Sequence, residues 1–136
     1  MKILGVGEKL PVRSRSIDRV ISAFALRNLS DRSGTFLEIY RVLTHGGIGT
    51  VIEFSPTESN SVWNPMTIYI KFLLPLFGGI LANDLDAYRY LSRTILAFAP
   101  PEALVAELTR TGFSNIRSKR LIGGVAVLYT FQKSDG

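Results

Sequence analysis

The chain has 136 residues, of which 46% are hydrophobic and 20% are charged, and its formal net charge is +5. These values are typical of one globular domain with its own core and exclude a disordered chain. The absence of cysteine excludes disulfides, thiolate metal sites and cysteine nucleophiles, and is compatible with a cytoplasmic setting. Basic side chains cluster densely only at Arg117, Lys119 and Arg120. We therefore expect a generic basic surface and no nucleic-acid partner.

The first part of the chain predicts a strand, a helix and a second strand. Both strand segments are short apolar runs with β-branched residues, and the helix has apolar positions at helical spacing. In chain order we expect a strand at Val20–Phe24, a helix from Ser30 or Asp31 to about Leu43, a helix-ending pair at Gly46–Gly47, and a strand at Ile48–Phe54. Such a unit is a right-handed crossover between two parallel strands.

The last third predicts helices followed by a hairpin. Proline suits the first turn of a helix and glycine its end. The expected elements are a helix capped by Asn83 or Asp84 that reaches Phe98, a helix from Pro100–Pro101 to Thr111 ended by Gly112, and strands at Asn115–Leu121 and Gly124–Phe131 around a tight turn at Ile122–Gly123. Two strands joined so closely pair antiparallel.

One apolar stretch, Met66–Ala82, requires a membrane test. It is shorter than the ~20 apolar residues that span a bilayer, and Lys71, Pro75 and Gly78–Gly79 interrupt it. The stretch predicts one buried helix or two short ones. The alternative is an apolar wall that binds a polyprenyl tail, or a surface that touches the bilayer. We therefore expect at most peripheral membrane contact.

A series of short motifs runs through the chain in a fixed order. They are L-G-V-G-E-K-L-P at Leu4–Pro11, S-I-D at Ser16–Asp18, F-A-L-R-N at Phe24–Asn28, R-V-L-T-H-G-G at Arg41–Gly47, N-D-L-D-A-Y-R-Y-L at Asn83–Leu91, and G-F at Gly112–Phe113. In this order and spacing the chain resembles the UbiE-type C-methyltransferases, which use S-adenosylmethionine to methylate ubiquinone and menaquinone precursors.

The resemblance implies an α/β fold that is a truncated Rossmann-like methyltransferase fold. Residues 1–136 would be a single domain corresponding to the C-terminal half of a class I methyltransferase. It would hold parallel strands four and five, the C-terminal antiparallel hairpin of strands six and seven, and inserted substrate-side helices. The family's glycine-rich cofactor loop has no counterpart, because Gly5–Gly7 has no strand before it and lacks the third glycine.

By this resemblance, Arg27 and Asn28 are the candidate catalytic residues. They follow a predicted parallel strand, at the end where open α/β sheets bind ligands. An arginine can stabilise a phenolate-like acceptor and orient a base, and an asparagine can hold a ring oxygen. The alternative is structural: Arg27 pairs with Asp31 or Glu53, and Asn28 supports the turn.

The resemblance places substrate contacts at Tyr88 and Tyr90, and Glu53 is a further candidate because of its place in the second predicted strand. Residues two apart on a helix point to different faces, so at most one of the tyrosines is expected to face the pocket, and both can instead be packing residues. Glu53 ends the second predicted strand, where its carboxylate can act on the phenol or cap a loop. Asp84 and Asp86 lie without further ligands nearby, so we predict no metal site.

Cofactor contacts fall on Val6, Gly7 and Ala23. The family has an aspartate beside the adenine at the position of Val6, and a serine near the cofactor at the position of Ala23. Only backbone contacts at Val6 and Gly7 remain, so binding of S-adenosylmethionine by this chain alone is not expected.

Without the first strand of the complete fold, the strand at Val20–Phe24 becomes a sheet edge, and natural proteins cover such edges. We expect a two-fold homodimer through this strand. A partner chain that carries the cofactor half is the rival, and Met1 as a misplaced start is a third reading.

Two functions follow from the sequence. One is a C-methyltransferase of quinone biosynthesis with a polyprenyl quinone-type substrate, inactive until the cofactor half is supplied. The other is a non-catalytic relic that binds a quinone-like lipid or a protein and acts as a dimer.

Overall fold

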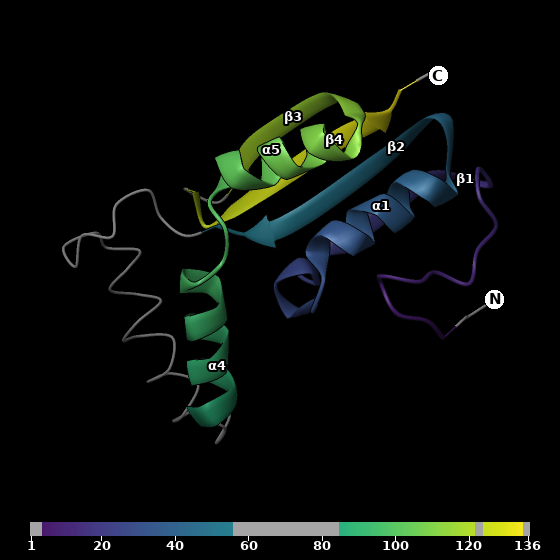
Figure 1. The fold of residues 1–136 in the computed structure, drawn as a ribbon. Helices are drawn as coiled ribbons and strands as arrows, with labels where there is room; N and C mark the ends of the chain where they lie inside the picture. Colours follow the sequence, from purple (N-terminus) through teal and green to yellow (C-terminus); the bar gives the residue numbers. More distant parts are fainter. Residues whose placement is uncertain (1–3, 56–84, 122–123, 135–136) are drawn as a thin grey trace.

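The structure, a computed structural model, describes residues 4–55, 85–121 and 124–134. Its elements in chain order are β1 (Ile17–Ala23), the 3-10 turn η1 (Leu26–Asn28), α1 (Arg32–Val42), β2 (Leu43–Phe54), α4 (Leu85–Leu96), α5 (Pro101–Thr111), β3 (Phe113–Leu121) and β4 (Ala126–Lys133) (Figure 1). Three sequence expectations lie outside the described residues: the stretch Met66–Ala82, the helix cap at Asn83 or Asp84, and the turn at Ile122–Gly123.

The four strands form one mixed sheet in the order β1-β2-β4-β3. β1 runs parallel to β2, and β4 pairs antiparallel with both β2 and β3. The predicted parallel pair and the C-terminal antiparallel pair are therefore confirmed. Within the described ranges, β1 has a strand partner on one side only, so it forms an edge of the sheet.

The first helix begins and ends as predicted, within one residue of the expected end at about Leu43. The Asp31 carboxylate accepts a 2.8 Å hydrogen bond from the Gly34 N–H and caps α1. The expectation that Gly46–Gly47 ends the helix is wrong, because Leu43 is already extended and opens β2, five residues before the predicted strand start at Ile48. Gly46 instead has a φ of 71° within β2. It lies in an irregularity of the β1–β2 pairing, between the pairs Ile17–Leu43 and Arg19–Ile48. Between these two pairs β1 advances by two residues and β2 by five.

The helix α5 confirms the reading of proline and glycine signals. Pro100 is its N-cap and Pro101 its first residue, and the left-handed Gly112 ends it with a φ of 103°. β3 follows immediately at Phe113, two residues earlier than predicted. This short connection packs α5 against the sheet that β3 enters.

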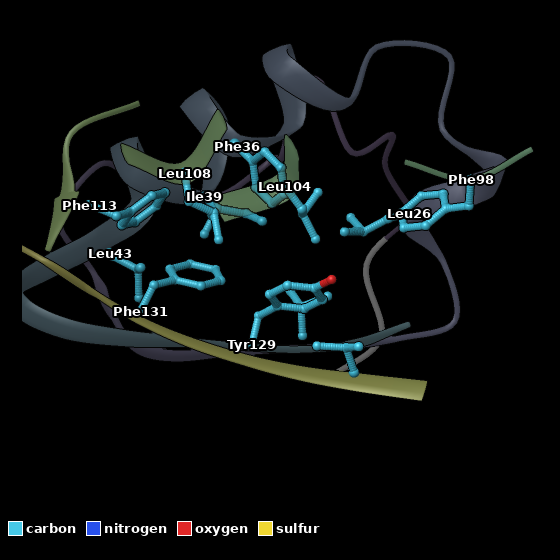
Figure 2. Packing of buried hydrophobic residues seen from close by; sticks show 12 residues of the cluster. Leu26, Phe36, Ile39, Leu43, Phe98, Leu104, Leu108, Phe113, Tyr129 and Phe131 are labelled. Atoms are coloured by element: carbon cyan, nitrogen blue, oxygen red, sulfur yellow. The ribbon is translucent and has the colours of Figure 1, made fainter. Parts of the chain in front are cut away.

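The core lies between the sheet and the two helices α1 and α5, which cover the same face (Figures 1 and 2). Phe36 of α1 meets Phe131 of β4 edge-on at 6.3 Å. Tyr129 is 1% exposed, and its burial raises the pKa of its hydroxyl to about 12. The cluster consists of Leu26, Phe36, Ile39, Leu43, Val51, Phe98, Leu104, Leu108, Phe113, Val127, Tyr129 and Phe131.

Candidate functional site

Arg27 and Glu53 meet where the two parallel strands end. Arg27 lies in η1 after β1, and Glu53 is the penultimate residue of β2. Their Nη1 and Oε1 atoms are 2.6 Å apart, and the Glu53 side chain is fully buried. The backbone N–H of Arg27 donates to the other carboxylate oxygen at 3.4 Å. The structure therefore brings two predicted site residues together as a buried ion pair.

Of the two structural partners considered for Arg27, the observed one is Glu53. Asp31 is occupied as the cap of α1. A buried carboxylate beside a guanidinium fixes the position of that guanidinium. If either group moved away, the other would remain buried as a charge without a partner. Glu53 thus holds Arg27 at the ligand side of the sheet.

Two aromatic rings that the sequence did not single out complete this corner. The Arg27 guanidinium lies 5.2 Å from the centroid of the Phe54 ring, and the rings of Phe24 and Phe54 are 4.5 Å apart. Phe24 has a φ of 54°, and its carbonyl accepts a 2.9 Å hydrogen bond from Arg27. A left-handed phenylalanine is strained, and such residues gather at functional sites. This backbone strain is not visible in a sequence pattern.

The Arg27 Nε atom is buried and has no hydrogen-bond partner in the part of the chain that the structure describes. A buried donor without a partner costs about 1–3 kcal/mol. The strained residue Phe24 and this unpaired donor therefore lie at the same place, because the Arg27 guanidinium also donates to the Phe24 carbonyl.

Asn28 is tied to α4 through Tyr90. The Tyr90 hydroxyl donates to the Asn28 Oδ1 atom at 3.1 Å, and Tyr90 is 51% exposed. This bond uses the carbonyl oxygen of the Asn28 amide, so the amide NH₂ group is the part that can donate to a ligand. Tyr88 also lies in α4, but its side chain is outside what the structure describes. The expectation that the two tyrosines face different sides stays a prediction.

A pocket of about 430 Å³ opens between η1 and the end of α4. Its two cations are already paired, Arg27 with Glu53 and Arg32 with Glu107, each at 2.6 Å. The remaining lining is apolar with hydroxyl groups, which suits a neutral, ring-like or aliphatic ligand. The lining residues are Leu26, Arg27, Leu29, Ser30, Arg32, Thr94, Ala97, Phe98 and Ala99.

The three predicted cofactor contacts do not form a cradle in the described residues. Val6 is 61% exposed and begins a turn closed by the Lys9 N–H. A Cβ added to Gly7 would lie 2.9 Å from Thr35 Oγ1 and 3.2 Å from Leu29. The space beside Gly7 is therefore filled by the protein itself, and Ala23 offers only an exposed methyl group. These residues do not fit a nucleoside on their own.

The segment that carries Val6 and Gly7 is held against α1 by one charged pair. Glu38 accepts bonds from Arg41 at 2.8 and 2.9 Å and from the Leu10 N–H at 2.9 Å. Arg41 also donates to the carbonyls of Leu10 and Val12. The Arg41 hydrogen bonds, followed by the Leu10 bond, lower the pKa of Glu38 to about 2.

Replacing Glu38 by glutamine should make the stability of the protein less sensitive to acid. The folded-state pKa of Glu38 is about 2, below its ordinary value of 4.5. Its contribution is therefore present above pH 4.5 and is lost as the pH falls towards about 2. Urea unfolding across that range should show the two proteins converging. Added salt should reduce the difference, because the pair is partly exposed. A constant difference at every pH would contradict this assignment.

Two further properties concern the described residues alone. Within them no group of three His, Asp or Glu side chains is placed to hold a metal ion. Among the helices described, none has the length and apolar character to cross a membrane.

Solved structures define the fold. A SAM-dependent methyltransferase from Thermotoga maritima superposes with a TM-score of 0.60 at 17% identity, covering 96% of this chain and 62% of that one. Phosphoethanolamine N-methyltransferase 2 from Haemonchus contortus gives a TM-score of 0.66 at 12% identity, covering 95% of this chain and 36% of that one. The fold is therefore the Rossmann-like fold of S-adenosylmethionine-dependent methyltransferases.

Sequence comparison narrows the class to one family. Residues 2–133 match the model of the ubiE/COQ5 methyltransferase family, and the chain belongs to that family. It is 38% identical over 128 residues to the ubiquinone/menaquinone biosynthesis C-methyltransferase of Stenotrophomonas maltophilia, covering 93% of this chain and 50% of that protein. The demethylmenaquinone methyltransferase of Thermus thermophilus is 38% identical over 120 residues, with coverages of 88% and 54%. The chain thus spans about half the length of these curated relatives.

Proposed function

We propose that this chain is the acceptor-side half of an S-adenosylmethionine-dependent C-methyltransferase that acts on a quinol precursor with a polyprenyl tail. Membership of the ubiE/COQ5 family and the names of the relatives support this reaction class. The observation that carries the proposal is the buried Arg27–Glu53 pair at the carboxyl ends of the parallel strands, where open α/β sheets bind their ligands.

The proposed chemistry of this half concerns the acceptor ring. C-methylation replaces a ring C–H bond by a C–CH₃ bond, with the methyl group supplied by S-adenosylmethionine when it is bound. The ring carbon would become nucleophilic when the quinol hydroxyl loses its proton to water and forms a phenolate, and the ring proton would also pass to water. Arg27 would stabilise the phenolate oxygen electrostatically. Asn28 would donate from its amide nitrogen to the other ring oxygen, since its Oδ1 atom already accepts from Tyr90. Glu53 acts through Arg27 as a positioning residue.

We infer that the cofactor side belongs to the part of the relatives that this chain does not match. The described residues at Val6, Gly7 and Ala23 form no cradle for a nucleoside, which supports this inference. We therefore expect the chain alone to be inactive and to require a polypeptide that binds S-adenosylmethionine. The filled space beside Gly7 is also the observation that favours the second candidate function, a non-catalytic protein that binds a quinone-like lipid.

The test is methyl transfer to a demethylmenaquinol when this chain is fused behind the part of the Thermus relative that it does not match. We expect turnover in the fusion and none in the chain alone. Arg27→Lys should lower kcat by about 10²-fold, because a lysine cannot keep both the Glu53 bond and the ring contact. Arg110→Lys, on the exposed side of α5, is the matched control and should leave kcat unchanged. Equal activity of both variants would contradict the role of Arg27, and an inactive fusion that binds the quinol would favour the non-catalytic reading.

A further inference from the structure

The ring of Phe24 lies at the end of β1, where the chain leaves the sheet for η1. Phe24 is 36% exposed, although its side chain is large and apolar. The ring packs on Phe54, the last residue of β2, with the ring centroids 4.5 Å apart and the planes tilted by 32°. Phe24 therefore presents aromatic surface at the end of the sheet where open α/β folds bind ligands.

The backbone of Phe24 is held in an unfavourable conformation. Its φ of 54° is unusual for a bulky residue, whereas glycine and asparagine adopt such values readily. Two hydrogen bonds of 2.9 Å fix it: the Phe24 N–H donates to the Ile52 carbonyl, and the Phe24 carbonyl accepts from Arg27 Nη1. Strain that the surrounding structure maintains in this way is typical of ligand sites. Because glycine or asparagine would serve the backbone better here, the phenyl ring itself needs a use.

The same contacts fix Arg27 relative to the aromatic pair. Arg27 Nη1 donates both to the Phe24 carbonyl and to the Glu53 carboxylate. The Arg27 guanidinium also lies 5.2 Å from the centroid of the Phe54 ring. A cation and an aromatic surface are therefore held together as one unit. A flat ring with an oxygen substituent suits such a unit, since the ring can stack and the oxygen can accept a hydrogen bond.

The proposed reaction involves two aromatic groups that could use this surface, the acceptor ring and the adenine of the cofactor. The positions that the resemblance assigns to the adenine, Val6 and Gly7, belong to a different segment, which is held against α1. Arg27, which is bonded to Phe24, is the residue proposed to contact the acceptor. The contacts therefore favour the acceptor ring as the occupant.

We propose that Phe24 is a specificity-determining residue whose ring stacks against the acceptor ring and selects an aromatic acceptor over a saturated one of similar size. This inference rests on the proposed function, because it concerns the acceptor of that reaction. The strained backbone keeps the Phe24 ring beside Arg27, and Phe54 supports it. Phe24 has no group that transfers a proton, so its role is to bind and orient the acceptor.

The test compares two probes under anaerobic conditions: 1,4-naphthalenediol, and decahydronaphthalene-1,4-diol, which keeps both oxygens but has no π-system. NMR titration of the chain and of the fusion should show tighter binding of the aromatic probe, with ring-current shifts at Phe24 and Phe54. Phe24→Asn should weaken binding of the aromatic probe about tenfold and change that of the saturated probe less than about twofold. Asparagine tolerates the left-handed backbone, so this variant should fold. Phe24→Tyr keeps a ring and should keep the selectivity.

Leu37→Asn is the matched control, because Leu37 is an apolar residue, 59% exposed, on α1. It should leave the affinity for both probes within about twofold. Equal loss of both probes in Phe24→Asn would show a structural role only and would overturn the proposal, as would the absence of shifts at Phe24 in both the chain and the fusion. Larger shifts at Phe24 with adenosine than with naphthalenediol would assign the ring to the cofactor and also overturn it. Selective binding by a fusion that does not methylate would contradict the proposed function alone, so the two proposals can fail separately.

Discussion

Replacing Glu53 by glutamine should lower the free energy of unfolding by about 3–5 kcal/mol. The substitution keeps the shape of the side chain but removes the charge that compensates Arg27 among the described residues, and the Arg27 side chain is 12% exposed. It also weakens the bonds that the carboxylate accepts from the backbone N–H groups of Arg27 and Phe54. Chemical denaturation monitored by circular dichroism measures the loss.

A double variant separates the charge effect from loss of packing. Arg27→Met together with Glu53→Leu removes both charges and should recover most of the lost stability, because an apolar pair of similar volume can replace a buried ion pair. The double variant should nevertheless lack methyl transfer in the fused assembly. If Glu53→Gln costs no more than a surface substitution, the assignment of a buried, mutually dependent pair is wrong.

Gly49→Ala should lower the stability of the protein more than alanine at any other glycine whose surroundings the structure describes. A Cβ at this position in β2 would lie 2.1 Å from Cε2 and 2.4 Å from Cζ of Phe131. The Phe131 ring is fully buried and also packs against Phe36 and Phe113, so it cannot move aside. Over-packing of this kind costs about 1–3 kcal/mol, and a contact this short places the effect at or above the upper end. Thermal unfolding measures the result.

The matched control for this prediction shortens the ring that the new methyl group meets. Phe131→Leu alone should destabilise the protein by leaving a cavity. Added to Gly49→Ala, it should cost less than the sum of the two separate changes, because the leucine makes room for the methyl group. Strictly additive losses would show that the methyl group and the ring do not collide.

The sequence predicted the elements whose signals are local. Proline and glycine bounded α5, Asp31 capped α1, and β-branched apolar runs marked β1 and β2. It failed at Gly46–Gly47, because this pair reads as a helix end when only neighbours in the chain are considered, whereas both glycines lie within β2. Whether those glycines end a helix or bend a strand depends on β1, about 28 residues earlier in the chain, which pairs with this part of β2.

In the candidate site, too, the sequence predicted what local residues determine and missed what depends on distant contacts. The family motif pointed to Arg27, and residue type alone allowed Glu53 as its partner. The choice of Glu53 over Asp31, the burial of the pair and the aromatic wall of Phe24 and Phe54 depend on contacts between segments some 26 to 30 residues apart. Such contacts follow from strand register, which no short motif encodes.

The most direct test of the account is calorimetry with S-adenosylmethionine on the isolated chain and on its fusion with the unmatched part of the Thermus relative. The central claim is that this chain holds the acceptor-side residues but no cradle for the cofactor. It predicts no measurable heat of binding for the chain alone and binding by the fusion. Micromolar binding of S-adenosylmethionine by the isolated chain would contradict it.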